Sequence, residues 1–503
     1  MFVIFYSISV RYTAANMNSF DVSAGPDGTF IKSGDIKSSP ADIDNFFSAL
    51  QDSTPVSSPP KSITLYFHGG LVNETAGKAI AEKMGAHLQQ AESIPVFFIW
   101  ETSIKETISF KLTQTANQSF CKKLIRVLVK YLAPKTGITG SDNKARGTGR
   151  LSDQEIDEQL QQERPFDRYA TNQSGSARGG NIITEAGWFG KSEMRRTALV
   201  EAELQMAVAR EPDFIKLLLE EPPPELENEI ANDRSRGFLS ALVIKRLTDV
   251  VMKVAKRFLS GTSHGFYPTI VEELFRAFYI ANVGAWVWDG MKSKARSLWQ
   301  DNMGRLGDNL FAGSYFLESL ERHITAFPQT KVHLVGHSAG SICICELLAA
   351  ARQRFPALKF ETIIFLAPAC RFNFFYEQVV LNPHLFARFR CFTMTDENEC
   401  NDVLVPGIYT RSLLYLVSGI LEDSEKAGVP ILGLHHFLGK SPACNDKDTW
   451  LEETEKFLLQ NDRLVLSATE AGALAGLQTN ALKHGDFDDN ELTIESIKYM
   501  ISH

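Results

Sequence analysis

The stretch from Val332 to Gly340 reads VHLVGHSAG and decides the fold. VHLV is typical of a short buried strand, and the apolar run after Ser338 is typical of a helix. Gly-His-Ser-Ala-Gly lies between them and matches the pattern Gly-x-Ser-x-Gly. A sharp turn from strand to helix strains the serine backbone and requires small neighbours, which Gly336, Ala339 and Gly340 provide. The pattern occurs by chance in many proteins, so the flanking strand and helix give it its weight.

Working outward from this turn, other short apolar runs have the character of buried parallel strands. Segments with helical spacing separate several of them, which is the arrangement of strand-helix-strand units in a parallel sheet. The sequence therefore predicts an α/β fold, with a mostly parallel sheet flanked by helices. The predicted strands are 63–67, 94–100, 332–335, 362–366, 389–395 and 464–467, and the predicted helices beside them are 75–91, 306–327 and 492–501.

The alternation of strands and helices stops between residues 103 and 300. We therefore expect one sheet domain in two parts, residues 1–102 and 301–503, interrupted by a large, mainly helical insertion. Residues 135–186 are polar and rich in Gly, Ser and charge, which favours a flexible loop. Three other stretches of the insertion have helical character, namely 194–210, 238–259 and 270–291.

Composition restricts the partners of the chain. Its 503 residues carry a formal net charge of −8, which argues against nucleic acid, because phosphate binding needs a basic surface. No H-E-x-x-H, paired C-x-x-C, dinucleotide-binding or phosphate-loop motif is present, so neither a metal nor an organic cofactor is expected.

The cysteines and the N-terminus favour a cytoplasmic protein. Seven cysteines cannot all pair, and Cys343 and Cys345 lie in a predicted buried helix, as small core residues do. Residues 1–10 are apolar but have no preceding positive charge, unlike a secretory signal peptide. Met17 is an alternative start, and secretion is the alternative compartment.

The GHSAG motif, the upstream His68-Gly69-Gly70 and the order of the downstream acidic and His residues make the chain resemble the α/β-hydrolase family of esterases and lipases. The resemblance covers residues 1–101 and 302–503, and the insertion has no part in it. It implies an α/β-hydrolase fold with Ser338 as the nucleophile. The expected activity is hydrolysis of carboxylic esters through an acyl-enzyme, on an ester or lipid-like small molecule.

The same resemblance predicts an oxyanion hole. Acyl transfer passes through a tetrahedral oxyanion that preorganised N–H groups stabilise. Ala339, directly after the nucleophile, would give one donor. The loop Gly69-Gly70-Leu71 would give the other, and Leu71 stands where lipase-like members often have a third glycine. The second donor therefore lies at Gly70 or Leu71.

In this family the triad runs Ser, acid, His along the chain. The acid follows the next-to-last strand, and Asp396 is the first residue beyond it, so a Ser-Asp-His triad with Asp396 is the leading assignment. The acid would orient the imidazole and stabilise its protonated form. The alternatives in the same loop are Glu397, Glu399 and Asp402.

His484 is the expected general base. It follows the strand 464–467 and precedes the last predicted helix, where the family places its histidine. His435 and His436 also follow the acid, but another strand and helix come after them, so they are too early in the topology.

The insertion is expected to form a lid or cap that controls access to the site. The predicted helix 238–259 is basic and amphipathic, so it either contacts a membrane or lipid surface peripherally or packs with its charged face in solvent. The aromatic stretch 267–292 either lines an acyl pocket or packs in the core. Neither the insertion nor the rest of the sequence predicts an oligomeric state.

Several functions remain open. Peptidases, thioesterases and acyltransferases use the same triad, and neither fold nor triad separates them from esterases. A catalytically silent binding protein with this fold is a further alternative. The presence of serine, acid, histidine and HGG together argues against a silent protein.

Overall fold

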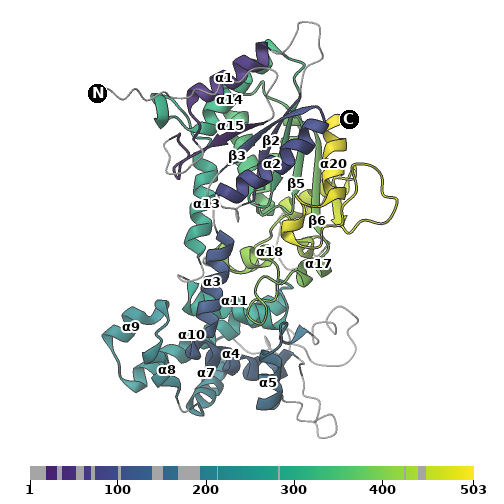
Figure 1. Cartoon of the computed structure of the whole chain (residues 1–503). Helices are drawn as coiled ribbons and strands as arrows, with labels where there is room; N and C mark the ends of the chain where they lie inside the picture. Colours follow the sequence, from purple (N-terminus) through teal and green to yellow (C-terminus); the bar gives the residue numbers. More distant parts are fainter. Residues whose placement is uncertain are drawn as a thin grey trace, which may run out of the picture.

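The computed structural model shows a sheet-bearing part and a helical part joined along one side (Figure 1). The described residues are 19–30, 37–52, 62–69, 74–99, 104–136, 138, 151–167, 193–211, 213–280, 284–423, 426–439 and 449–503.

Seven strands form one sheet, and every neighbouring pair is parallel. The strand order is β1-β3-β2-β4-β5-β6-β7. All six predicted strands are present, whereas β1 was not predicted because Asp21 interrupts its sequence, FDVS, and leaves no apolar run. The bounds are β1 Phe20–Ser23, β2 Ser62–Phe67, β3 Ser93–Ile99, β4 Val332–His337, β5 Phe360–Leu366, β6 Phe386–Met394 and β7 Leu464–Ser467.

The order of the strands marks one edge of the sheet as the place for a ligand. Along the chain β2 is followed by its neighbour on one side, β3, whereas β4 is followed by its neighbour on the other side, β5. In open parallel sheets the crevice at such a switch point, outside the carboxyl ends of the strands, is where ligands bind. His68 and Gly69 follow β2 there, and Ser338 follows β4.

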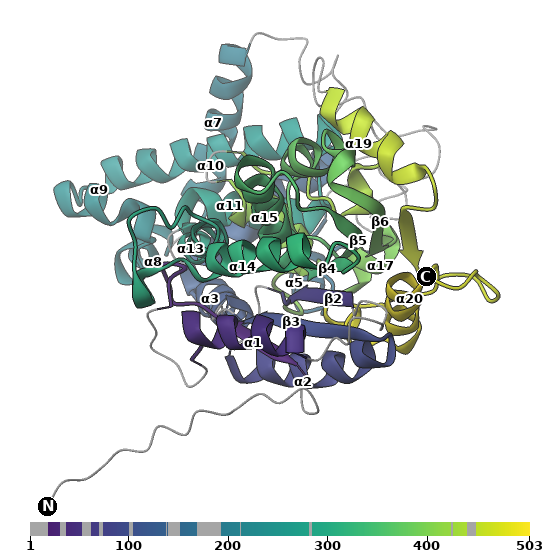
Figure 2. The ribbon, with the colours of Figure 1, turned by 90° about the horizontal axis from the view of Figure 1, so that it is seen from above.

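Helices cover both faces of the sheet (Figure 2). On one face, Met84 and Ile497 belong to a buried cluster with Tyr66, Phe97 and Val335 of the strands. The other face carries the larger buried cluster, which continues into the helical part. The first face is covered by α2 (Glu74–Gln90) and α20 (Glu491–Ser502), and the second by α1 (Pro40–Asp52), α14 (Ala312–Ala326), α15 (Gly340–Arg354), α16 (Phe372–Phe375) and α19 (Thr449–Leu459).

The helical part comes from the chain between β3 and β4. In Figure 1 it lies below the sheet, and α17 (Asp396–Asn401) and α18 (Leu413–Leu416) lie between the two. Because α17 follows β6, the carboxyl ends of the strands face the helical part. Its helices are α3 (Ile104–Asn117), α4 (Ser119–Leu132), α5 (Asp153–Leu160), α7 (Glu193–Ala209), α8 (Phe214–Glu220), α9 (Glu227–Asn232), α10 (Arg236–Leu259), α11 (Phe266–Phe278) and α13 (Ala285–Ser297).

One predicted helix of the insertion is in fact two. The stretch 270–291 is divided between α11 and α13. Gly284, directly before α13, has a φ of 88° and a left-handed conformation, which a right-handed helix cannot continue. Aromatic residues on both sides of Gly284 continue the apolar pattern, so hydrophobic periodicity alone does not reveal the break.

The segment 135–186 is not a flexible loop throughout. It contains α5, whose start is fixed by a capping box between Ser152 and Glu155. Phe166, shortly after α5, is buried against aromatic rings of α11. Most of the rest of the segment lies outside the described residues.

The basic helix α10 packs within the protein. Its apolar side faces α7 and α11, whereas Lys245, Lys253 and Lys256 are exposed. This arrangement corresponds to the packed alternative for the predicted helix 238–259. Among the described residues, no helix has the length and apolarity needed to cross a membrane. The buried apolar residues of α10 are Leu239, Val243, Ile244, Leu247, Val250, Val251, Val254 and Ala255.

The close contact of α15 with β2 gives a test of this arrangement. A Cβ added at Gly340 would lie 2.1 Å from the backbone O of Phe67, so Gly340→Ala should lower the free energy of unfolding by about 3 kcal/mol. Gly237, in the first turn of α10, has no neighbour within 4 Å of such a Cβ. Gly237→Ala should therefore raise stability by roughly 0.5 kcal/mol. Urea unfolding of both variants measures this, and equal effects would contradict the packing.

Candidate functional site

The turn between β4 and α15 holds Ser338 in a strained conformation. Its φ is 52°, which lies in the left-handed region that a non-glycine residue seldom adopts. Three backbone hydrogen bonds hold it there: the Ser338 N–H donates to Leu366 O at 2.8 Å, and its C=O accepts from the N–H of Ser341 at 3.1 Å and of Ala369 at 3.0 Å. The Ser341 hydroxyl donates to the same carbonyl at 2.6 Å. The serine oxygen is thereby fixed at the carboxyl end of β4.

His484 lies against this serine. Its Nε2 is 2.9 Å from Ser338 Oγ, so the hydroxyl can donate its hydrogen to the ring. The two residues are separated by 146 positions in the sequence and are 2% and 5% exposed. The geometry is that of a nucleophile and a general base within hydrogen-bond reach. The structure thus brings together two of the three residues expected to form a triad.

The loop after β2 also reaches this site. A Cβ added at Gly69 would lie 3.3 Å from Ser338 Cβ, so only a small residue fits there without displacement. His68 is buried and its Nδ1 lies 2.8 Å from Gly69 O, while burial lowers its pKa to about 4. Gly70 and Leu71 lie outside the described residues.

Ala339 is placed as an oxyanion donor would need to be. It directly precedes Gly340, the first residue of α15, and is fully buried beside the serine. The first N–H groups of a helix have no acceptor within the helix. They also carry the positive end of the helix dipole, which favours negative charge.

Three of the four candidate acids accept hydrogen bonds through their side chains, whereas Glu397 is exposed at the surface. Asp402 Oδ2 accepts a hydrogen bond from the backbone N–H of His484 at 2.8 Å. Asp396 accepts one from the Tyr415 hydroxyl. Glu399 is buried and accepts from the Ser412 hydroxyl, and burial raises its pKa to about 8.

The alternative histidine His436 lies beside Asp396 and Tyr415. His436 Nδ1 is 3.6 Å from Asp396 Oδ1, and the ring lies edge-on to that of Tyr415. His435 and His436 form a short helical turn after residue 434, before α19 and β7. Asp396, the leading candidate for the acid, therefore contacts His436, an alternative candidate for the base. Asp402, an alternative candidate for the acid, contacts His484, the leading candidate for the base.

A buried ion pair beneath His484 was missed by the sequence reasoning. His337 Nε2 donates to the backbone O of His484 at 2.9 Å, and its Nδ1 lies 3.1 Å from Asp488 Oδ2. The Tyr66 hydroxyl donates to the same carboxylate at 3.4 Å. In the sequence, His337 is the second residue of the GHSAG motif, and Asp488 is one of several acidic residues before the last predicted helix. Their contact spans 151 positions and leaves no local sequence signal.

This pair favours a charged histidine. Both ring nitrogens of His337 face acceptors, so only the doubly protonated ring satisfies both. Burial opposes the charge, but the Asp488 carboxylate outweighs it and raises the pKa of His337. Burial likewise acts to raise the pKa of Asp488, and His337 outweighs it, so that the pKa is lowered. The His484 backbone is thus held at its N–H by Asp402 and at its C=O by His337.

A second serine, histidine and carboxylate set occurs near α11. His264 Nδ1 is 2.8 Å from Glu272 Oε1, and its Nε2 is 3.5 Å from Ser418 Oγ. However, the Ser418 hydroxyl donates to Val429 O at 2.7 Å, and both Ser418 and Glu272 are fully buried. The three side chains therefore hydrogen-bond with their neighbours within the core, as buried polar groups do. The Ser418 proton is directed away from His264.

Comparisons of the chain with protein-family models, with curated proteins and with solved structures found no match. Within the described part of the chain, no group of three or more His, Cys, Asp or Glu side chains is arranged to hold a metal ion. The site must therefore be interpreted from its own geometry.

The His337–Asp488 pair predicts a pH-dependent stability. Because the pKa of His337 is higher in the folded than in the unfolded chain, its charge stabilises the fold fully when the pH is below the unfolded pKa of about 6.5. This contribution is lost as the pH rises through the pKa of His337 in the folded protein. Because the pKa of Asp488 is lower in the folded than in the unfolded chain, its charge stabilises the fold when the pH is above the unfolded pKa of about 3.8. This contribution is lost as the pH falls through the pKa of Asp488 in the folded protein. Asp488→Asn should therefore cost about 3 kcal/mol near pH 5.5 and less at pH 9.

Urea unfolding at the two pH values measures this difference. Asp489→Asn is the matched control, because Asp489 is exposed and pairs with the exposed Lys83, which contributes about 0.5 kcal/mol at most after solvent screening. A penalty for Asp488→Asn that does not change with pH would contradict a charged His337.

Proposed function

We propose that this protein is a serine hydrolase with an α/β-hydrolase fold that cleaves carboxylic esters. The observation that supports this most strongly is the 2.9 Å contact between Ser338 Oγ and His484 Nε2 on a strained turn from strand to helix. The position of this turn at the switch point of a seven-stranded parallel sheet adds support.

The reaction follows from the atoms at this site. His484 Nε2 takes the proton of Ser338 as Oγ attacks the ester carbonyl carbon, and the N–H groups of Ala339 and of Gly70 or Leu71 stabilise the oxyanion. The intermediate collapses to an acyl-serine as His484 protonates the departing alcohol. Water, deprotonated by His484, then attacks the acyl-enzyme, releasing the carboxylic acid and restoring the serine.

We propose Asp402 as the acid of the triad in preference to Asp396. Its carboxylate already contacts the His484 backbone, whereas Asp396 is engaged with Tyr415. A carboxylate beside the imidazole fixes its tautomer and stabilises the imidazolium that forms during attack. Asp402 is also the C-cap of α17, which places it at the carboxyl end of the sheet.

The helical part would control access to this serine. It lies beyond the carboxyl ends of the strands, where a lid is placed to cover the site (Figure 1). Ser338 and His484 are almost entirely shielded from solvent. A movement of the helical part that uncovers Oγ would admit an ester, as in enzymes whose lids gate the substrate.

Ser338→Ala tests the nucleophile. We expect a fluorophosphonate probe to label the purified wild type but not this variant, and kcat/KM on p-nitrophenyl butyrate to fall by at least about 10⁴-fold, because no other group can form the acyl-enzyme. Ser418→Ala is the control from the second serine and histidine set, and it should keep both labelling and activity. Folded wild type that is neither labelled nor active would instead favour a silent binding protein.

Comparison of Asp402→Asn with Asp396→Asn tests the acid. Loss of the triad carboxylate should lower kcat by about 10³–10⁴-fold, through an incorrectly oriented and less stabilised imidazole. We expect this for Asp402→Asn and less than a tenfold change for Asp396→Asn. Steady-state kinetics on the same ester measures both, and the reverse order would restore Asp396 as the acid.

A further inference from the structure

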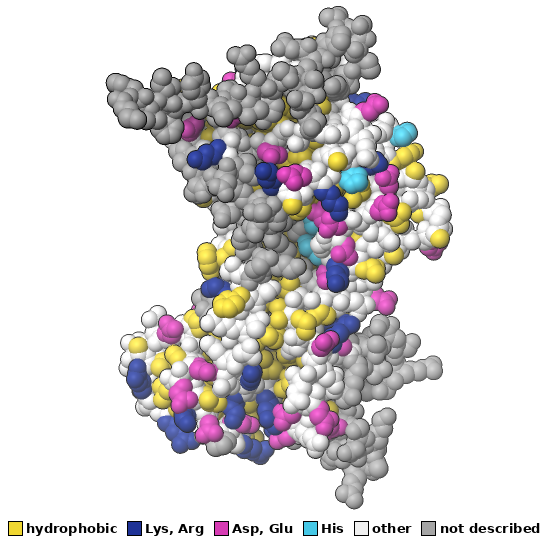
Figure 3. Space-filling view, in the orientation of Figure 1, with side chains coloured by type: hydrophobic (Ala, Val, Ile, Leu, Met, Phe, Trp, Pro, Cys, Tyr) yellow, Lys and Arg dark blue, Asp and Glu magenta, His cyan; other side chains and the backbone are white. Residues whose placement is uncertain are grey.

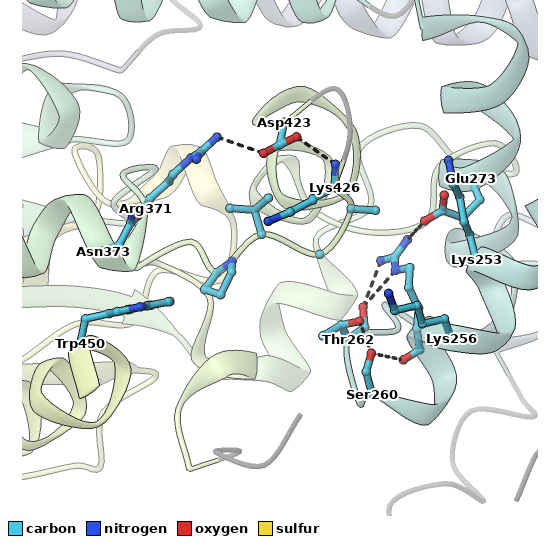
Figure 4. A pocket seen from close by; sticks show the side chains of 15 residues that line it. Lys253, Lys256, Ser260, Thr262, Glu273, Arg371, Asn373, Asp423, Lys426 and Trp450 are labelled. Atoms are coloured by element: carbon cyan, nitrogen blue, oxygen red, sulfur yellow. Dashed lines mark hydrogen bonds and ion pairs between the residues drawn. The ribbon is translucent and has the colours of Figure 1, made fainter. Parts of the chain in front are cut away.

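A cavity of about 490 Å³ lies between the helical part and the sheet-bearing part (Figure 4). Ser338 is not among the residues that line it. Lys253 and Lys256 of α10 form one wall, and Trp450 of α19 stands on the opposite side. Asp423 and residues 426–430 line it between these walls. The volume falls in the range of about 300–1,000 Å³ that is usual for small-molecule sites.

The lining of this cavity has an excess of positive charge. It contains five Lys or Arg residues and two carboxylates. The whole chain has a net charge of −8, and on the face in Figure 3 cationic and anionic side chains are interspersed. A cationic cavity in an acidic protein therefore stands out from its surroundings.

Two of the cations are neutralised within the protein. Arg257 pairs with Glu272 and Glu273, and Arg371 pairs with Glu422 and Asp423. These pairs use the two carboxylates of the lining.

The three lysines are different. Among the described residues, no carboxylate oxygen lies within 4 Å of the Nζ of Lys253, Lys256 or Lys426. The backbone N–H of Lys426 bonds to Asp423, which leaves its ammonium group directed to the cavity (Figure 4). The charge of Lys253 still acts on the nearby Glu273, where it favours a lower carboxyl pKa, but none of the three ammonium groups is held in an ion pair within the described part of the chain. Such a group of cations favours a ligand with more than one negative charge.

Trp450 adds a second kind of contact. In Figure 4 its ring extends from α19 toward the cavity, facing the lysine wall from the other side. It is only partly buried, although apolar rings of this size are usually covered. A flat ring of a ligand can stack on it, as nucleic-acid bases stack on aromatic side chains.

We propose that this cavity binds a soluble phosphorylated ligand that carries a flat ring, such as a nucleoside diphosphate. The phosphates lie against Lys253, Lys256 and Lys426, and the ring stacks on Trp450. Lysine is a suitable partner because its ammonium acts as a point charge for phosphate oxygens. Since its walls come from α10 and from the sheet-bearing part, the ligand connects the two parts of the molecule. This binding is independent of the proposed ester hydrolysis.

Isothermal titration of the full chain with ADP, at low ionic strength, tests the proposal. We expect saturable binding, with Lys256→Gln and Lys426→Gln each weakening it about tenfold. Lys245→Gln is the matched control, since Lys245 is an exposed lysine of the same helix that does not line the cavity. All three positions are exposed, so the folds should be retained, and thermal unfolding checks this.

Pyrophosphate and Trp450→Ala separate the two contacts. Trp450→Ala should weaken ADP binding at least fivefold and leave pyrophosphate binding unchanged, because only the ring stacks. Absence of ADP binding would overturn the proposal, as would equal weakening by Lys245→Gln.

Sedimentation with phosphatidylcholine vesicles, with and without phosphatidic acid, distinguishes a soluble ligand from a lipid headgroup. Retention on the acidic vesicles without ADP binding would identify a lipid headgroup in place of the soluble ligand and would also overturn the proposal.

Discussion

The close approach of the β4–α15 turn to β2 is the constraint on which the site depends. Gly340 lies so near the backbone of Phe67 that no side chain fits, and the Ser338 N–H bonds to the end of β5. Three neighbouring strands and one helix are therefore fixed around a single residue. The strain at Ser338 is held by these contacts, because a left-handed serine would relax in a looser turn. The same contacts bring Gly69 of the β2 loop against Ser338.

The sheet could be predicted because its central strands are buried on both faces and form continuous apolar runs. Two kinds of element could not. β1 has only four residues, with Asp21 among them, and pairs along the outer edge of β3. The break between α11 and α13 depends on the backbone conformation of Gly284, to which hydrophobic periodicity is insensitive. In both cases tertiary structure decided what local sequence left open.

The site was predictable where its signal is local and not where it is distant. Ser338, Ala339 and Gly69 belong to short motifs, and His484 could be placed by its order after β7. The surroundings of His484 are set by Asp402 and His337, which contact its backbone from 82 and 147 positions away in the sequence. An N–H or C=O group of the main chain is the same in every residue, so the identity of His484 carries no information about these partners. The histidine is thus positioned through its main chain, and its side chain is left to face the serine.

The second set, formed by Ser418, His264 and Glu272, shows why proximity of residue types is not a sufficient criterion for catalysis. Its carboxylate and imidazole are as close as those of a triad, and burial lowers the pKa of His264 to about 4 despite Glu272. What differs is the serine. The Ser418 proton is committed to Val429 O, within a continuous helical segment, whereas the Ser338 hydroxyl faces Nε2 from a strained turn. A nucleophile requires a backbone that directs its oxygen to the base and toward the ligand edge of the sheet, and only the Ser338 turn meets both conditions among these two sets.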